Sequence, residues 1–256
     1  MPTPRALVLR APGTNCDAET AHAFRLAGAE AQSIHIQRLL AEPALLDACQ
    51  VLCIAGGFSY GDDLAAGRVL GGQVRLRLAD ALRRFRDAGK LILGICNGFQ
   101  VLASTDLLDL EDAHGPLATL TRNDSGRYEA RWVHLRTAPS NCVFLAGIDR
   151  IELPVAHAEG KFVARDAQTL ASLEQGGRLP LRYAAADGGE PCYPANPNGS
   201  PAHVAGACDA SGRVFGLMPH PERFVDPTQH PEWTRTRSDA AGAGLALFQN
   251  AVRYFG

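Results

Sequence analysis

The sequence predicts an α/β protein with an open, doubly wound and mostly parallel sheet, helices on both faces, and an antiparallel extension. Over about the first 110 residues, short apolar runs alternate with amphipathic stretches, which is typical of repeated strand–helix units. Farther along, strand-like stretches follow one another without an obvious helix between them, which favours antiparallel pairing. The sequence has no internal repeat or linker, and we expect a single domain over residues 1–256.

The first part of the chain supplies the strand–helix units in order. Buried parallel strands are predicted in three apolar runs: RALVLRAPG (5–13), VLCIAGG (51–57) and KLILGIC (90–96). One helix is predicted over residues 16–29, with Asn15 or Asp17 as its cap, and another over residues 98–108. The clearest helix runs from Gln73 to Ala88, because its apolar residues recur at helical spacing on one face.

The second part has a different pattern. Strands are predicted within YEARWVHLRTA (128–138) and IELPVAHAEGKFV (151–163), and a hairpin turn around residues 209–212. A closing helix is expected from Ser238 to Tyr254.

Composition excludes several classes of protein. The formal charge is −2 at pH 7, and no basic cluster stands out, so neither a nucleic acid nor a membrane surface is an expected partner. No apolar run approaches the roughly 20 residues that span a bilayer. Seven scattered cysteines, in a sequence without a secretory leader, are typical of reduced thiols, and we expect a cytoplasmic protein. No metal-binding motif is present, and we expect no metal site.

Cys96 is the strongest candidate for chemistry. It stands between Gly94 and Gly98 where a buried strand turns into a helix, which repeats the pattern of a nucleophile elbow. The start of the following helix favours a thiolate, so we expect its pKa to be lowered. A buried core cysteine is the alternative, and these residues alone leave the choice open. We interpret the other six cysteines as structural.

A cysteine nucleophile needs a base and a group that orients the base. Two His-x-Glu segments are available, His157 with Glu159 and His220 with Glu222. Pro221 favours an extended backbone at His220, in which residues two apart point the same way. This backbone geometry favours His220 and Glu222 as the base and its orienting group, without excluding His157 and Glu159.

The segment AGGFSYGDDLAAG (55–67) follows a predicted strand and lacks the Lys-Ser/Thr end of a nucleotide-binding loop. A glycine-rich turn there can aim backbone N–H groups at an oxyanion. We expect Gly57 to lie in this oxyanion hole, with the N–H of Asn97, the residue after the nucleophile, as the second donor.

Taken together, these motifs resemble the class I, triad-type glutamine amidotransferases, which have a flavodoxin-like fold. The resemblance covers nearly the whole chain and is most specific to the branch that supplies the glutaminase component of phosphoribosylformylglycinamidine synthase. It is carried by APGTNCDAE, GGFSYGDDLAAG, GICNGFQVL, RNDSGRYEARWV, LPVAHAEGKF, YPANPNGS and GLMPHPER. Ala158 departs from the family pattern, in which we expect glycine, so the role of that segment stays open.

The resemblance implies a function and a set of site residues. Cys96, His220 and Glu222 would form the triad, and Gln100 would help to hold the substrate glutamine. The chain itself would need no cofactor; ATP and Mg would act on a separate synthetase subunit, which receives the ammonia, with a small third subunit in the complex. The alternatives are a stand-alone cysteine γ-glutamyl hydrolase and a non-catalytic binding subunit on the same fold.

Overall fold

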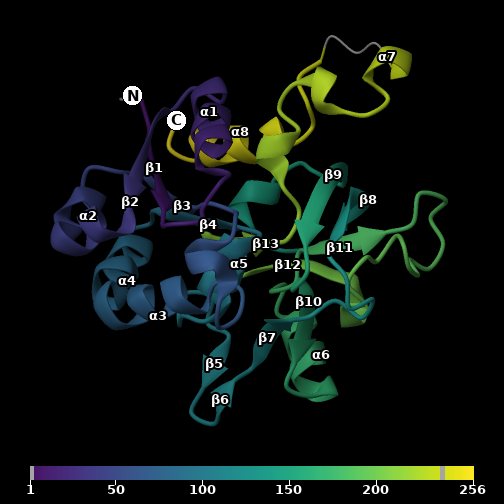
Figure 1. The fold of residues 1–256 in the computed structure, drawn as a ribbon, viewed down its shortest axis with the longest axis horizontal. Coiled ribbons are helices and arrows are strands. Elements are labelled where there is room, and N and C mark those ends of the chain that lie inside the picture. The colour runs from purple at the N-terminus through teal and green to yellow at the C-terminus, as the bar shows by residue number, and fades with distance from the viewer. Residues whose placement is uncertain (1–2, 237–239) are drawn as a thin grey trace.

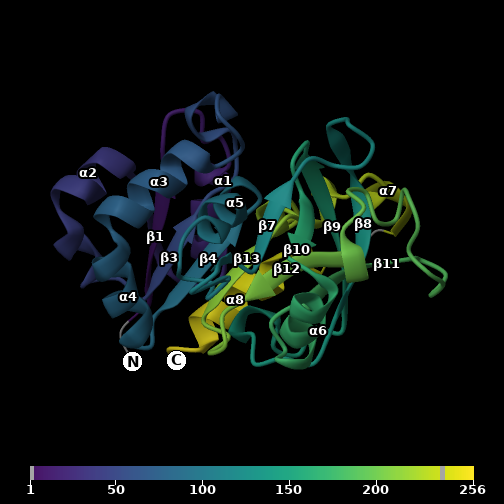
Figure 2. The ribbon, with the colours of Figure 1, turned by 90° about the horizontal axis from the view of Figure 1, so that it is seen from below.

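A computed structural model describes residues 3–236 and 240–256 of the chain. Its main feature is a nine-stranded sheet with the strand order β2-β1-β3-β4-β13-β12-β11-β8-β9. The pairs from β2 to β13 are parallel, and the pairs from β13 to β9 are antiparallel. Figures 1 and 2 show these two parts side by side. The predicted fold class, a parallel sheet with an antiparallel extension, is confirmed.

The predicted apolar runs all contain strands, and the structure adds strands that the sequence pattern did not predict, namely β2, β5, β6, β7 and β11. Strands β1, β3, β4 and β13 of the parallel part are buried over most of their length because helices cover both faces of the sheet, whereas the edge strand β2 has only one buried residue. In chain order the strands are β1 (Arg5–Arg10), β2 (Glu30–His35), β3 (Val51–Ile54), β4 (Leu91–Ile95), β5 (Glu111–Asp112), β6 (Gly115–Pro116), β7 (Ala118–Thr121), β8 (Glu129–Thr137), β9 (Arg150–His157), β10 (Lys161–Ala164), β11 (Leu181–Ala184), β12 (Val204–Cys208) and β13 (Val214–Leu217).

Helices α1 and α8 and helices α3, α4 and α5 lie on the two faces of the parallel part, whereas α6 contacts β10 and α7 lies away from the parallel strands (Figure 1). On one face α1 packs on α8, where Phe24 and Phe248 meet edge to face with centroids 4.9 Å apart. On the other face α3 contacts both α4 and α5. The helices are α1 (Asp17–Leu26), α2 (Ile36–Ala41), α3 (Arg68–Arg77), α4 (Ala79–Asp87), α5 (Asn97–Ala103), α6 (Ala167–Gln175), α7 (Trp233–Thr236) and α8 (Leu245–Arg253). In the part of the chain that the structure describes, no helix is long and apolar enough to cross a bilayer.

Four predictions about helices need correction. The single helix expected from Gln73 to Ala88 is two, α3 and α4, separated at Leu78, whose φ of −119° departs from that of a regular α-helix. Leu78 stays buried, so the same apolar stripe continues across the break and hides it from the sequence pattern.

The other three corrections concern helix ends. The helix predicted over residues 98–108 is α5, which begins at Asn97 and ends at Ala103. Cys16 takes the cap position of α1 without a side-chain capping bond, and Asp17 lies inside the first turn, where an acidic group suits the helix dipole. The closing helix α8 begins at Leu245; Ser238 and its two neighbours, 237 and 239, lie outside the described residues.

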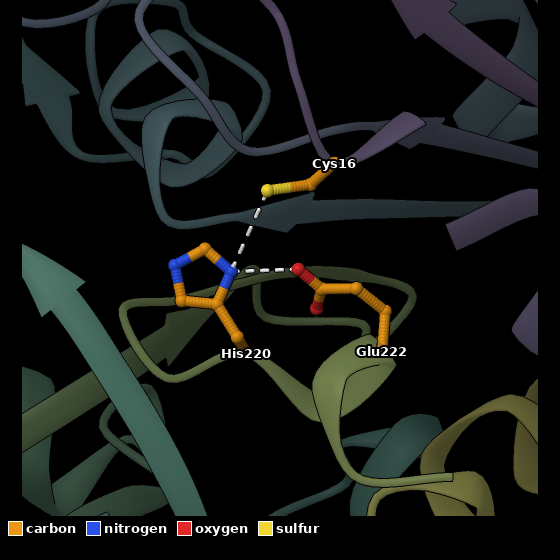
Figure 3. A group of neighbouring side chains, drawn as sticks. All are labelled: Cys16, His220 and Glu222. Atoms are coloured by element: carbon orange, nitrogen blue, oxygen red, sulfur yellow. Dashed lines mark hydrogen bonds and ion pairs between the residues drawn. The ribbon is translucent and has the colours of Figure 1, made fainter. Parts of the chain in front are cut away.

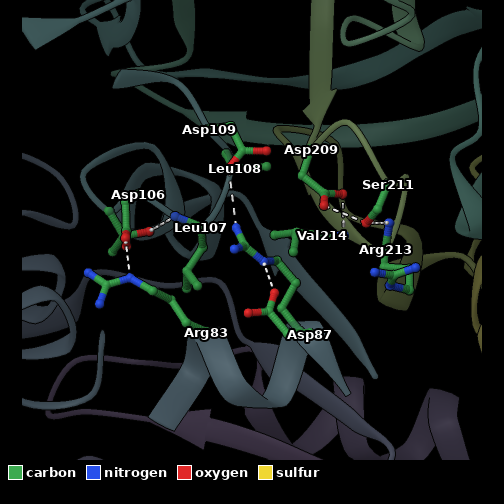
Figure 4. A network of polar contacts seen from close by, with 12 residues as sticks. Arg83, Asp87, Asp106, Leu107, Leu108, Asp109, Asp209, Ser211, Arg213 and Val214 are labelled. Atoms are coloured by element: carbon green, nitrogen blue, oxygen red, sulfur yellow. Dashed lines mark hydrogen bonds and ion pairs between the residues drawn. The ribbon is translucent and has the colours of Figure 1, made fainter. Parts of the chain in front are cut away.

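A polar network holds the edge of the parallel sheet at which its strands begin (Figure 4). On α4, the Nε of Arg83 lies 2.5 Å from Oδ2 of Asp106, in the loop after α5. In the predicted β12–β13 turn, the Asp209 carboxylate accepts a bond from the Val214 N–H at 2.9 Å. The first contact joins α4 to the loop after α5, and the second holds the β12–β13 turn. The carboxyl ends of the parallel strands form the opposite edge, where the glycine-rich segments lie.

Candidate active site

Cys96 and His220 follow two neighbouring parallel strands. Ile95, the last residue of β4, is paired with Leu217, the last residue of β13, and the Cys96 N–H donates to the Leu217 carbonyl at 2.7 Å. The carboxyl ends of parallel strands meet at one edge of a sheet, which is where ligands bind in this fold class. Residues 124 positions apart in the sequence are therefore brought to one place by the register of β4 and β13.

The turn at Cys96 has the geometry of a nucleophile elbow. Its φ of 51° and ψ of −105° lie outside the regions that non-glycine residues ordinarily occupy, and α5 begins at the next residue. A side chain at Gly94 would come within 2.6 Å of the Gly98 carbonyl, and one at Gly98 would collide with the Ile54 carbonyl. The two glycines thus allow β4, α5 and β3 to approach closely, as the sequence pattern predicts.

Strand β9 of the antiparallel extension lies against both Cys96 and His220. The Cys96 Sγ lies 3.6 Å from the Ala156 carbonyl, and the His220 N–H donates to the Pro154 carbonyl at 2.8 Å. The two side chains are only 5% and 2% exposed, respectively. The extension therefore closes the site on the side away from the parallel strands.

His220 and Glu222 form a buried pair. The Nδ1 of His220 lies 2.6 Å from Oε1 of Glu222, which is fully buried. Burial alone would lower the pKa of His220, but Glu222, Cys96 and Cys16 outweigh it and hold the pKa well above its usual range. Among the described residues, neither Nε2 of His220 nor Oε2 of Glu222 has a hydrogen-bond partner. The imidazole is thus held through Nδ1, and its other nitrogen is free for chemistry.

Cys16, which sequence reasoning left as structural, lies against the same imidazole. Its Sγ is 3.9 Å from Nδ1 of His220 and accepts a bond from Nη2 of Arg223 at 3.2 Å. Figure 3 shows the sulfur and the Glu222 carboxylate approaching one ring nitrogen, while the second nitrogen points away from both. Burial raises the pKa of the Cys16 thiol, so the sulfur stays protonated. The signal in the sequence was its place in the APGTNCDAE motif, which spacing alone could not connect to residue 220.

The donor atoms of Cys16, His220 and Glu222 all lie within 4.8 Å of one another, close enough to surround a metal ion. We assign no metal to this group. The Arg223 guanidinium contacts the sulfur directly and would repel a cation, and the short bond between His220 and Glu222 is that of a proton-sharing pair.

The glycine-rich segment after β3 is held in place by the N-terminal motif. The N–H groups of Asn15 and Cys16 both donate to the Gly56 carbonyl, at 3.4 and 3.2 Å, and Thr14 forms a bridge with Gly57. The φ of Gly57 is 137°, and a side chain there would lie 2.6 Å from the Asn15 nitrogen, so the position requires glycine.

Asn97 connects this loop to the elbow. Its Oδ1 accepts a bond from the Ser59 N–H at 3.3 Å, and its Nδ2 donates to Asp62 at 3.1 Å. The two predicted oxyanion residues, Gly57 and Asn97, thus belong to segments that are hydrogen-bonded to each other beside Cys96. Their role as oxyanion donors stays a prediction.

Gln100 lies one turn into α5 and is 8% exposed. Its side-chain amide is engaged within the protein, donating to the Glu159 carbonyl at 2.5 Å and accepting from Asn97 Nδ2 at 3.0 Å. It therefore ties the elbow helix to the turn after β9. Contact with a substrate glutamine stays a prediction for this residue.

The alternative pair, His157 and Glu159, does not form a base with its orienting group. The ring Nδ1 of His157 is bonded to Oδ1 of Asn123 at 3.1 Å, whereas the Glu159 carboxylate accepts from the Ala66 N–H at 3.2 Å. Burial lowers the pKa of His157 to about 3, so this imidazole is neutral. His157 and Glu159 are thus bonded to different partners, whereas His220 and Glu222 are bonded to each other; the catalytic role of the second pair stays a prediction.

Comparison with known proteins agrees with this geometry. The CobB/CobQ-like glutamine amidotransferase domain matches residues 3–255. The chain is 49% identical over 252 residues to the phosphoribosylformylglycinamidine synthase subunit PurQ of Dehalococcoides mccartyi, covering 98% of this chain and 97% of that protein. It is 41% identical to the subunit of the same name from Methanococcus maripaludis, again over 98% and 97% of the two chains.

Among solved structures, PurLQS from Thermotoga maritima contains a chain with 31% identity and a TM-score of 0.75, and the match covers 100% of both chains. Sequence identity, coverage and fold thus agree over the full length. The chain belongs to the CobB/CobQ-like glutamine amidotransferases and, within them, to the branch of the PurQ subunits.

Proposed function

We propose that this chain is the glutaminase subunit of phosphoribosylformylglycinamidine synthase. It hydrolyses glutamine to glutamate and ammonia and passes the ammonia to a synthetase subunit. That subunit converts formylglycinamide ribonucleotide to formylglycinamidine ribonucleotide in purine biosynthesis. The observation that supports this most strongly is the elbow cysteine beside a buried His–Glu pair, in a chain 49% identical to a PurQ subunit over nearly its whole length.

The proposed chemistry is acyl transfer through a thioester. The Cys96 sulfur attacks the side-chain amide carbon of glutamine, and the carbonyl oxygen becomes an oxyanion held by N–H groups at Gly57 and Asn97. His220, oriented by Glu222, gives a proton to the nitrogen that leaves as ammonia. The same imidazole then takes a proton from water, whose oxygen attacks the thioester and releases glutamate and the Cys96 thiol.

The ring nitrogen of His220 that each cysteine faces decides which cysteine is the nucleophile. Cys16 lies at Nδ1, which already shares its proton with Glu222 at 2.6 Å and is not free to accept another. Cys96 leaves the strand next to His220, and the unpartnered Nε2 is the nitrogen that can take the thiol proton. We therefore assign the attack to Cys96.

The partners follow from the relatives. PurLQS of Thermotoga maritima is an assembly of three kinds of subunit, and we propose that this chain likewise works with a PurL-type synthetase and a small PurS-type subunit. ATP and Mg are expected on the synthetase, and the chain itself uses no cofactor. Free ammonia is protonated in water at neutral pH and loses its nucleophilicity, so direct transfer within a cytoplasmic complex is expected.

The test compares two nitrogen sources in the assembled complex. Cys96→Ala should abolish synthesis from glutamine and leave synthesis from added ammonium salt intact, because only the release of ammonia needs the thiol. Cys192→Ala, a change at an exposed cysteine, is the matched control and should leave both activities unchanged. If both activities fell together in the Cys96 variant, the division of labour would be wrong.

A second measurement separates the alternatives. A glutamine analogue with an electrophilic ketone should label Cys96 in the isolated chain, and peptide mapping identifies the modified residue. Label on Cys16 instead would reassign the nucleophile. Absence of label together with full complex assembly would favour a binding subunit, and release of glutamate from γ-glutamyl peptides without a partner would favour a hydrolase.

A further inference from the structure

Cys16 is not needed as a nucleophile in the proposed function, yet it is 1% exposed and touches the base. Its sulfur has contacts on three sides. It donates to Oδ1 of Asn15 at 3.2 Å, accepts from Nη2 of Arg223 at 3.2 Å, and lies 3.9 Å from Nδ1 of His220. A residue that fills space alone would not need both its donor and its acceptor capacity.

Backbone contacts fix the place of this sulfur. The Cys16 N–H donates to the Gly56 carbonyl, and a side chain on Gly56 would lie 3.2 Å from the sulfur and 3.0 Å from Cε1 of His220. The sulfur and the imidazole therefore rest together on the glycine-rich segment after β3. A shift of any one of the three would move the other two.

The contacts of Arg223 indicate what Cys16 does in the site. It directly follows Glu222, and its guanidinium is held by two residues of the N-terminal motif region, by Glu19 through Nε at 3.1 Å and by Cys16 through Nη2. Glu222 has a second carboxylate oxygen, Oε2, that is buried and without a hydrogen-bond partner among the described residues. An unpaired buried carboxylate oxygen attracts any guanidinium that can reach it.

We propose that Cys16 is a positioning residue: its thiol holds the Arg223 guanidinium away from Glu222, so that this carboxylate serves the His220 imidazole alone. The proposal rests on the proposed function, because it gives Cys16 a task only if His220 is the base. The Glu19 carboxylate supplies the opposite charge at Nε, and the sulfur fixes the direction of Nη2. A sulfur suits the task because it is large enough to reach both Nη2 and the ring and too weak an acceptor to take the Nδ1 proton from Glu222.

The consequence is electrostatic. Among the described residues, the charged and titratable groups that act on His220 or on its neighbours Cys16, Glu222 and Arg223 are Cys96, His157, Tyr128, Cys53 and Glu19. An unshared Glu222 anion favours the imidazolium form of His220, which pairs with the Cys96 thiolate. A guanidinium moved onto Glu222 would cancel part of that field and lower the pKa of His220.

The test is the pH profile of glutaminase kcat/KM in the assembled complex. Its alkaline limb reports loss of the His220 proton. Cys16→Ala and Cys16→Val both remove the acceptor for Arg223, the second while filling most of the space. Each variant should move the alkaline limb of the kcat/KM profile to lower pH by about one unit, which is the effect of one nearby charge on a pKa. Cys16→Ser keeps an acceptor for Arg223 and should leave the limb where it is.

A double variant identifies the route of the effect. If Arg223 causes the shift, Cys16→Ala with Arg223→Leu should restore the limb, because the guanidinium is no longer there to reach Glu222. Arg223→Leu alone should not move the alkaline limb to lower pH. A limb that stays in place in Cys16→Ala and Cys16→Val, or one that the double change fails to restore, would overturn the proposal.

Failure of this inference is distinguishable from failure of the proposed function. Labelling of Cys96 by the glutamine analogue, measured in the same variants, reports on the nucleophile. If Cys96 is labelled and the limb does not move, only the role of Cys16 is wrong. If Cys16 carries the label, the assignment of the nucleophile is wrong and the positioning role falls with it.

Discussion

The two edges of the parallel sheet are built differently. At the carboxyl edge, Cys96 has a left-handed φ of 51°, and the His220–Glu222 pair is buried, with one polar atom of each residue lacking a hydrogen-bond partner in the described part of the chain. At the opposite edge, Arg83 makes ion pairs with Asp80 and Asp106 through partly exposed side chains. Backbone strain and buried charge are costly and persist where the surrounding structure holds them for function. Exposed ion pairs contribute little. Changes at the first edge should therefore affect the reaction, and changes at the second should not.

The largest effect is expected at the buried carboxylate. Glu222→Gln keeps the size of the side chain but removes the charge that holds the His220 proton, so kcat for glutamine should fall by roughly 10²- to 10⁴-fold. Steady-state kinetics with glutamine and with ammonium salt check this, and the ammonia-dependent rate should not change. A variant with near-normal glutamine turnover would show that the charge is dispensable and would weaken the contrast between the edges.

A glycine exchange tests the packing of the elbow. Gly98→Ala places a methyl group against the Ile54 carbonyl, which should displace α5 and cost about 1–3 kcal/mol in the free energy of unfolding, with a large loss of glutaminase activity. Gly72→Ala is the matched control. Gly72 lies in α3 with nothing within 4 Å of its added carbon, so the change should stabilise the protein by up to about 1 kcal/mol. Denaturant unfolding measures both, and equal effects would contradict the close approach of α5 to β3.

The buried imidazole of His157 predicts a pH dependence of stability. Its pKa is about 3 in the folded protein against an ordinary value of 6.5, so the unfolded chain binds more protons between these values. Stability should therefore fall as the pH drops below about 6.5, by about 2 kcal/mol at pH 5 from this residue.

His157→Gln removes this contribution, and its unfolding free energy should depend less on pH between 6.5 and 5 than that of the parent. His22→Gln, at an exposed histidine, is the control and should keep the parental slope. Parallel curves for the parent and the His157 variant would mean that the imidazole is protonated or accessible in the folded state.

The smallest effect is expected at the opposite edge. Arg83→Ala removes the ion pairs with Asp80, which is mostly exposed, and Asp106, which is partly exposed, so the thermal midpoint should hardly change and kcat for glutamine should stay at the parental value. Differential scanning calorimetry and the glutaminase assay measure the two quantities. A marked loss of activity would show that this network influences the site through α5.

The sequence by itself determined the local elements of this protein. The apolar runs and glycines were sufficient to predict β1, β3 and β4, the elbow at Cys96, and a His-x-Glu segment that can act as a base. These features depend on residues within a few positions of one another, where periodicity and turn chemistry are informative. The family resemblance then supplied the choice of His220 and Glu222.

The tertiary structure decided which of these elements meet. The sequence predicted the hairpin at residues 209–212 but not that β13 joins the parallel strands beside β4, and this pairing is what brings His220 to Cys96. The break at Leu78 and the placement of Cys16 at Nδ1 were equally hidden. Strand neighbours and contacts across about 200 residues are set by the packing of the whole core, and local periodicity carries no information about them.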